Sequence, residues 1–153
     1  MDVINKTPPP FVEKVDTSYL ENLVGYNSRR AALVIIGIFF ERMAIYDLRP
    51  VDFSVLSLVT HNPGITSRQL STTLGILAPN LVGMVNGLEK KALIYRLPHP
   101  HDGRATGLHP TALGQKMMSD AETTASELEN AATSALSHTE RKTLMKLLKK
   151  IYK

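Results

Sequence analysis

The chain has 153 residues, of which 43% are hydrophobic and 21% charged, a composition typical of a single globular domain. It contains no cysteine, which excludes disulfide scaffolds, thiol redox sensors and cysteine nucleophiles and fits an intracellular, cytoplasmic protein. The longest uncharged apolar run, residues 31–40, is too short to cross a bilayer as a helix, so no membrane partner is expected.

The net charge of +4 is concentrated in the middle of the chain. Residues 66–116 hold six basic side chains against two acidic ones, whereas the flanking segments are nearly balanced. A polyanion such as DNA would be met by this middle segment.

The N-terminal part is expected to be a flexible arm, residues 1–16, followed by a long helix from Ser18 within residues 17–48. Three consecutive prolines interrupt the arm, which lacks the basic, apolar start of an export signal. In the helix, residues 33–40 are apolar on every side. A small domain can hardly cover such a helix, so a second copy of the chain is the natural cover and a homodimer is expected.

Residues 50–110 predict three helices and a hairpin. Pro50 begins a helix that Asn62-Pro63-Gly64 ends. Thr66-Ser67-Arg68-Gln69 has the pattern of a capping box and opens a short helix that ends at Leu74-Gly75. The next helix runs from Ala78 to about Lys91, and its expected buried stripe is Leu81, Val82, Val85 and Leu88.

The period then changes from helical to extended. Residues 94–97 and 105–108 predict a two-stranded hairpin around a loop at residues 98–103. Two helices follow. Pro110-Thr111 begins the first, with Thr111 as its expected cap, and the second runs from about Thr139 to Ile151 with Leu144, Leu147, Leu148 and Ile151 facing inward. These helices, residues 111–153, form the expected dimerisation part together with residues 17–48. The fold class is therefore mostly α with a small β-hairpin, a winged helix-turn-helix with long terminal dimerisation helices.

Enzyme chemistry is not expected. The sequence has no glycine-rich phosphate loop, nucleophile elbow or carboxylate pair at a fixed spacing, and no parallel strands to carry them. Neither a cofactor nor a resident metal is predicted. His99, His101 and Asp102, with His109 nearby, leave a regulatory metal open beside solvated loop histidines, although their spacing matches no compact ligand pattern.

The stretch Leu88-Glu89-Lys90-Lys91-Ala92-Leu93-Ile94-Tyr95-Arg96 resembles the end of the recognition helix in the MarR family of transcription regulators, and Asp102-Gly103-Arg104 resembles that family's wing signature. Leu108, Thr111 and Gly114 fall where the family's Leu, Thr and Gly follow the wing, and the similarity covers about residues 20–150. This chain departs from the family pattern at Gly103, at Pro110 and at Ala92, where a residue other than glycine is expected to strain a left-handed helix cap. It also has Gly83, Met84 and Gly87 where many relatives carry arginine.

The predicted DNA contacts lie on the two short helices and the wing. Helix amides and side chains at residues 67–69 suit phosphate, whereas Asn80 suits adenine unless it only caps the helix. Arg104 suits a narrow minor groove, with Asp102 either extending it or stabilising the turn. Lys90 and Lys91 contact DNA or stay solvated. The full predicted set is Ser67, Arg68, Gln69, Ala78, Pro79, Asn80, Gly83, Met84, Lys90, Asp102 and Arg104.

The resemblance also implies an effector pocket where the first helix, the second helix and the helix after the wing meet. Its candidate lining is Tyr26, Arg29, Arg30, Phe39, Asp52, Phe53 and Leu56. An arginine pair beside an apolar helix favours an anionic aromatic effector, a phenolic acid or its acyl-CoA thioester. The alternative, to which the sequence gives equal weight, is that Arg29 and Arg30 form ion pairs with Glu21, Glu41 or a partner chain. The residues 23–31 also resemble relatives that respond to hydroxycinnamoyl-type compounds.

These features predict a homodimeric repressor that occupies a pseudo-palindromic operator and is released by a small anionic aromatic ligand. The alternative is a winged helix that binds protein and not DNA. The concentrated positive charge favours DNA.

Overall fold

The computed structural model describes residues 11–153; most of the predicted arm lies outside the described residues. The chain divides into two compact units, Met1–Leu33 and Val34–Lys153, and each is described by itself. The sequence divided the chain by role, into dimerisation helices and a DNA-binding lobe at residues 50–110. A single chain does not test this division, which stays a prediction.

The first unit contains a short helix, α1 (Ser18–Glu21), and the start of α2 (Val24–Met43). The expectation of one helix from Ser18 was wrong, because the helical hydrogen bonding stops at Asn22. Side-chain amides replace it: Asn22 donates to the Ser18 carbonyl, and Asn27 donates to the carbonyls of Glu21 and Leu23 at 2.7 and 2.9 Å. Asparagine side chains compete with the helix in this way and favour such breaks.

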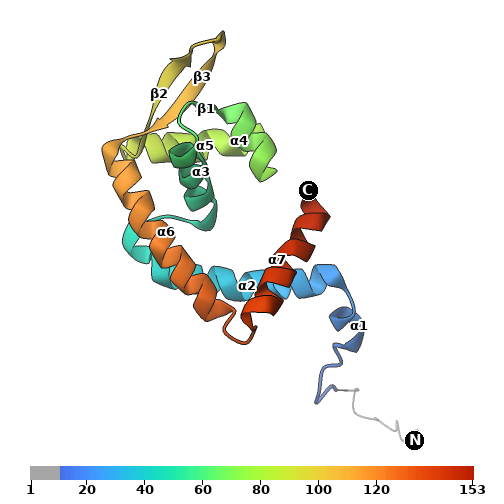
Figure 1. Ribbon diagram of the computed structural model, residues 1–153. Coiled ribbons are helices and arrows are strands. Elements are labelled where there is room, and N and C mark those ends of the chain that lie inside the picture. The colour runs from blue at the N-terminus through green and yellow to red at the C-terminus, as the bar shows by residue number, and fades with distance from the viewer. Residues whose placement is uncertain (1–10) are drawn as a thin grey trace, which may run out of the picture. The chain divides into compact units, whose positions relative to one another are not determined.

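The second unit carries a helix-turn-helix followed directly by a β-hairpin (Figure 1). After α2 its elements are the 3-10 helix η1 (Ala44–Tyr46), α3 (Pro50–His61), β1 (Ile65–Thr66), α4 (Ser67–Leu74), α5 (Ala78–Lys90), β2 (Ile94–His99), β3 (Asp102–Pro110), α6 (Ala112–Ala132) and α7 (His138–Tyr152). The predicted order of helices and hairpin is confirmed, and the fold class is mostly α with a small sheet.

The sheet has three antiparallel strands in the order β1-β3-β2, one strand more than the sequence predicted. The extra strand is two residues long, with Ile65 opposite Leu108 and Thr66 opposite Gly107, too short for a period-2 pattern to reveal. The hairpin tip is also tighter than expected. β2 and β3 continue to His99 and Asp102, with an irregularity in register after Pro98.

The core of the second unit lies between α3, α4, α5, the sheet and α6. Along α5 the predicted stripe is confirmed at Leu81, Val85 and Leu88 and wrong at Val82, which is 56% exposed. The largest fully buried side chains of the core are Met43, Leu56, Leu70, Leu81, Leu88, Leu93, Ile94, Leu108, Met118 and Leu128.

Two backbone positions join α5, the wing and α6. Ala92 has a φ of 55°, the left-handed conformation that its departure from glycine was expected to strain. Gly114 lies so close to Leu93 that a Cβ there would stand 2.0 Å from the Leu93 carbonyl oxygen. Thr111 caps α6 as predicted: its Oγ1 accepts from Gly114 N at 2.9 Å and donates to Ala92 O at 2.7 Å.

Large apolar side chains on α7 and on the second half of α2 are exposed in the single chain. Helix α7 has no buried residue, so the expectation that Leu144, Leu147, Leu148 and Ile151 point into a core is wrong for one chain. On α2, Val34, Ile36 and Phe40 are likewise exposed. Faces of this kind indicate an interface with another copy or another molecule.

Within residues 11–153, none of the helices combines the length and the hydropathy that a membrane span requires.

Candidate DNA interface and effector cavity

The amino end of α4 presents polar groups on the surface. Thr66 and Gln69 form the predicted capping box, in which Thr66 Oγ1 accepts from Gln69 N at 3.3 Å and Gln69 Oε1 accepts from Thr66 N at 2.9 Å. Ser67 and Arg68 are exposed beside it. The remaining first-turn amides and the positive end of the helix dipole suit an anion.

The predicted recognition helix, α5, presents a mostly small and uncharged surface. Ala78, Pro79 and Asn80 are exposed in its first turn. Leu77 occupies the N-cap position of α5, and no side chain caps the helix there. Within residues 11–153 the side-chain amide of Asn80 forms no hydrogen bond, so it does not serve as a cap. Val82 adds an exposed apolar group that the expected pattern placed in the core.

Gly83 is exposed, whereas the side chain of Met84 is partly turned toward the core. Met84 is half-buried and packs against the core. Both residues line a small cavity of about 240 Å³, together with Asp47, Arg49, Asp52, Gly87, Leu88 and Lys91. Their predicted contact with DNA therefore stays a prediction and falls at the margin of the helix's exposed surface.

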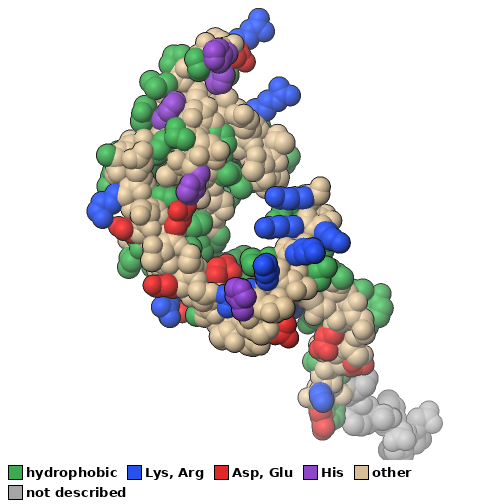
Figure 2. Space-filling view, viewed as in Figure 1, with side chains coloured by type: hydrophobic (Ala, Val, Ile, Leu, Met, Phe, Trp, Pro, Cys, Tyr) green, Lys and Arg blue, Asp and Glu red, His purple; other side chains and the backbone are tan. Residues whose placement is uncertain are grey.

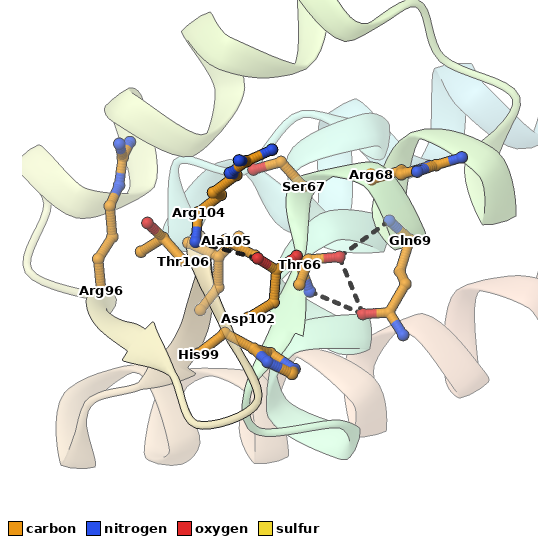
Figure 3. A pocket seen from close by; sticks show the side chains of 11 residues that line it. Thr66, Ser67, Arg68, Gln69, Arg96, His99, Asp102, Arg104, Ala105 and Thr106 are labelled. Atoms are coloured by element: carbon orange, nitrogen blue, oxygen red, sulfur yellow. Dashed lines mark hydrogen bonds between the residues drawn. The ribbon is translucent and has the colours of Figure 1, made fainter.

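The wing and α4 enclose a cleft of about 510 Å³ that gathers three arginines: Arg68 of α4, Arg96 of β2 and Arg104 of β3. In Figure 3, Arg96 and Arg104 extend from the two wing strands in the same direction, and Ser67 lies beside Arg104. Asp102 Oδ1 accepts from the Arg104 amide at 3.0 Å, which favours a turn-stabilising role for this carboxylate. The cleft is positively charged and polar, as a phosphate-binding surface requires.

Arg96 is a residue that the sequence-based site prediction missed. Its Nη2 donates to Asn86 Oδ1 at 2.6 Å, and its Nε lies 3.3 Å from Glu89 Oε2, so it ties β2 to α5 while facing the cleft. Only its place at the end of the Leu88–Arg96 motif could have signalled this role.

The two lysines at the end of α5 differ. Lys90 is exposed and has no ion pair within residues 11–153, which leaves it available to a phosphate. Lys91 is held by Asp47, with Nζ 2.7 Å from Oδ2 and 2.6 Å from the Asp47 carbonyl oxygen. The hydrogen bond and charge of Lys91 lower the pKa of Asp47. Lys91 therefore anchors α5 to the loop between α2 and α3.

The wing histidines form no recognisable metal site. His99 and His101 pack edge to face at the hairpin tip, and His109 stacks on Tyr95 further down. No group of three potential metal ligands comes together within residues 11–153.

A larger cavity of about 860 Å³ lies between the second half of α2, α3, α6 and α7. Its walls are mostly apolar, and Phe39 and Phe53 meet there edge to face with ring centroids 5.7 Å apart. Both belong to the predicted effector lining. Volume and character are those of a small-molecule site.

The other predicted effector residues are not among those that line this cavity of the second unit. Leu56 is fully buried in the core, and Asp52 pairs with Arg49 at 2.7 Å at the start of α3, a contact that raises the pKa of Arg49. Tyr26, Arg29 and Arg30 belong to the first unit, where Tyr26 is half-buried and both arginines are exposed. Glu21 of the same unit bonds to Thr17 and not to either arginine. Contact of these five residues with an effector stays a prediction.

The sequence profile of the MarR family matches residues 46–105. The transcriptional repressor CouR, solved on a 23-mer DNA duplex, is 34% identical over 92% of this chain and 99% of its own, with a TM-score of 0.85. CouR bound to p-coumaroyl-CoA gives 33% identity over the same shares and a TM-score of 0.81. A protein of Thauera aromatica, described as a transcriptional regulatory protein for the hcr operon, is 28% identical over 131 residues, 85% of this chain and 79% of that protein.

The likeness to CouR extends over nearly the full length of both chains. Together with the profile match across the helix-turn-helix, it shows that this chain belongs to the MarR family of transcription regulators and not to an enzyme family.

Proposed function

We propose that this regulator is a homodimeric repressor that holds a pseudo-palindromic operator and releases it when an aromatic acyl-CoA thioester binds. The observation that carries the DNA part is the cleft between α4 and the wing, which Arg68, Arg96 and Arg104 line together. Because its proposed partner is DNA, we propose that the regulator acts in the cytoplasm.

In this proposal α5 enters the major groove and the wing follows the backbone into the minor groove. Asn80 reads a base, while Ala78 and Val82 offer apolar contacts to thymine methyl groups. Ser67, Arg68, Gln69, Lys90 and Arg96 bind phosphates, and Arg104 enters a narrow A/T-rich minor groove.

Dimerisation is supported by the exposed apolar side chains on α7 and on the second half of α2. Two copies that bury these faces against each other would carry two recognition helices. Because a two-fold dimer presents the same residues twice, its operator repeats the half-site with inverted symmetry.

The effector class is supported by the cavity between α2, α3, α6 and α7 and by the CouR complex with p-coumaroyl-CoA. The cavity's apolar walls suit the aromatic acyl body of such a ligand. Of the two ligand classes considered, a free phenolic acid and its acyl-CoA thioester, the thioester is the better supported, since CouR is solved with one. Arg29 and Arg30 are proposed to bind the ligand's anionic groups.

The DNA assignment is tested by fluorescence anisotropy with duplexes tiled over the intergenic region beside the protein's own gene. The unchanged protein should bind one duplex tightly. Arg104→Ala should weaken binding and reduce the slope of log affinity against log salt by about one for each of the dimer's two wings. Lys142→Ala, which removes an exposed lysine of α7, serves as the control and should leave affinity unchanged.

The same assay separates DNA binding from the alternative, a winged helix that binds protein. A protein-binding module would show no preference among duplexes and no difference between Arg104→Ala and Lys142→Ala. Asn80→Ala sharpens the result, because loss of a base contact should change the preference between operator variants by about 1–3 kcal/mol at one base pair.

A further inference from the structure

The cavity between α2, α3, α6 and α7 has apolar walls and two polar ends of opposite hydrogen-bonding character. Phe39, Phe53 and Leu144 are among the apolar side chains that line it. One end carries a carboxylate, Glu122 of α6, and the other carries a guanidinium, Arg141 of α7.

The carboxylate end is held in place by two donors from α3. Ser57 Oγ donates to Glu122 Oε1 at 2.9 Å, and His61 Nε2 lies 2.7 Å from the same oxygen. Both contacts use Oε1, so Oε2 keeps its capacity to accept a hydrogen bond. This end of the cavity is therefore built to receive a donor such as a phenolic hydroxyl.

The guanidinium end has donors that the protein does not use. Arg141 donates from Nη1 to Asn130 Oδ1, and its Nε is the one buried side-chain nitrogen or oxygen without a hydrogen-bond partner in residues 11–153. Glu129 also lines the cavity but forms no ion pair with Arg141 in the described part of the chain. Leaving a buried donor unpaired is costly, and a ligand oxygen would remove that cost.

The two ends are separated along α6. Glu122 and Asn130, which orients Arg141, lie eight residues apart on one helix, which corresponds to about 12 Å at 1.5 Å per residue. A ligand that reaches both ends must be elongated, with a donor at one extremity and an acceptor toward the other.

We infer that Glu122 and Arg141 select a hydroxyaryl acyl group, with the phenolic hydroxyl donating to Glu122 and the acyl carbonyl accepting from Arg141. This inference rests on the proposed function for the ligand class and assigns the residues that read it. Arg141 takes the neutral carbonyl and not the phosphates of the carrier, because Glu122 and Glu129 make the cavity unfavourable for further negative charge.

The inference is tested by isothermal titration of the full chain, without DNA, with p-coumaroyl-CoA and with cinnamoyl-CoA, which lacks only the phenolic hydroxyl. A site that hydrogen-bonds a hydroxyl rejects the analogue without it, so the unchanged protein should prefer p-coumaroyl-CoA by about tenfold or more. Glu122→Ala should erase this preference while cinnamoyl-CoA still binds. Glu127→Gln, on an exposed part of the same helix, should keep the preference.

Arg141→Gln should weaken both thioesters alike, by about ten- to a hundredfold, because both carry the carbonyl. Its matched control, Lys142→Gln, should bind both as the unchanged protein does. Thermal unfolding of each variant is recorded alongside, and the melting temperature of Arg141→Gln should match that of Lys142→Gln.

Equal affinity of the unchanged protein for the two thioesters, no binding of either, or an undiminished preference in Glu122→Ala would overturn the inference. So would unchanged ligand affinity in Arg141→Gln, or a large loss of its melting temperature, which would assign Arg141 to the fold. Since no DNA is present, failure of operator binding is seen separately: it would refute the proposed repressor while the ligand assignments stand.

Discussion

The winged helix-turn-helix buries most of its apolar side chains, whereas the terminal helix α7 exposes its own. In the lobe, Leu70, Leu81 and Leu88 are almost completely buried by contacts within the chain. On α7 no residue is buried, although Leu147 and Ile151 repeat at the spacing of one helix face. The lobe thus buries most of its apolar side chains within one chain, whereas α7 leaves an apolar face exposed that a partner could cover.

Basic side chains, unlike buried apolar ones, occur both in the lobe and on α7. The lobe draws three arginines to one cleft, while α7 carries basic side chains along its whole length (Figure 2). On α7 these are Arg141, Lys142, Lys146, Lys149 and Lys150 against the single acidic Glu140. Basic charge alone therefore does not single out a DNA-binding surface. The proposed surface differs from α7 in that its arginines line one cleft at the start of α4.

The largest effect is expected where α6 packs against the lobe, at Gly114. A methyl group at this position would overlap the Leu93 carbonyl oxygen, so Gly114→Ala should lower the free energy of unfolding by about 3 kcal/mol or more. Gly87→Ala is the control, since nothing lies within 4 Å of its added Cβ, and it should be neutral or slightly stabilising. Equal melting curves for the two variants would show that the close approach of α6 to Leu93 is absent.

The second effect concerns α7. Leu147→Glu combined with Ile151→Glu should convert the dimer to a monomer, because two charges would enter the proposed apolar interface. Sedimentation velocity measures the change at concentrations where the unchanged protein is dimeric. Lys142→Glu on the same helix is the control and should remain dimeric; a dimeric double variant would remove α7 from the interface.

A third variant tests whether Arg29 and Arg30 of the first unit take part in the response to the effector. If Arg29 and Arg30 bind the anionic groups of the effector, their joint replacement by glutamine should keep operator affinity but abolish release by p-coumaroyl-CoA. A structural ion pair would instead lower the melting temperature. Normal release together with an unchanged melting temperature would contradict both interpretations of this pair.

A smaller effect is expected where α5 joins the wing. Ala92 adopts a φ of 55°, so Ala92→Gly should relieve strain and raise the free energy of unfolding by about 1 kcal/mol. Chemical denaturation measures this gain, and an Ala92→Gly protein that is less stable would show that the left-handed turn is not strained.

The smallest effect is expected at the surface pair of Asp47 and Lys91. Lys91 lowers the pKa of Asp47 below its ordinary value of 3.8, so the pair stabilises the fold above that value and the contribution is lost as the pH falls through the lower folded-state pKa. Asp47→Asn should therefore melt slightly earlier at neutral pH and converge with the unchanged protein in acid. A constant difference down to pH about 3 would contradict the assignment.

The sequence predicted the parts of the fold that depend on local patterns. The Thr66–Gln69 capping box, the Thr111 cap and the hairpin are such patterns, and all three are present. The short strand β1 and the break at Asn22 were missed, because two paired residues have no period and a side-chain amide overrides helix propensity.

The candidate sites were predictable to a smaller degree, since they are assembled from distant segments. Arg104 and Arg68 were expected to face DNA, but Arg96 joins them only because β2 lies beside β3. Phe39 and Phe53 were expected at the effector cavity, whereas Glu122 and Arg141 come from helices whose packing no local pattern reveals. Sequence reasoning therefore found the residues near motifs and missed those brought in by tertiary contacts.

In the proposed repressor, two lobes, one from each chain of the dimer, bind one operator together. Sedimentation equilibrium of the protein with its tightest-binding duplex, combined with hydroxyl-radical footprinting, tests this directly. We predict two chains per duplex and two protected half-sites about one helical turn apart, both lost on addition of p-coumaroyl-CoA. One chain per duplex, or a single protected site that persists in saturating ligand, would contradict the claim.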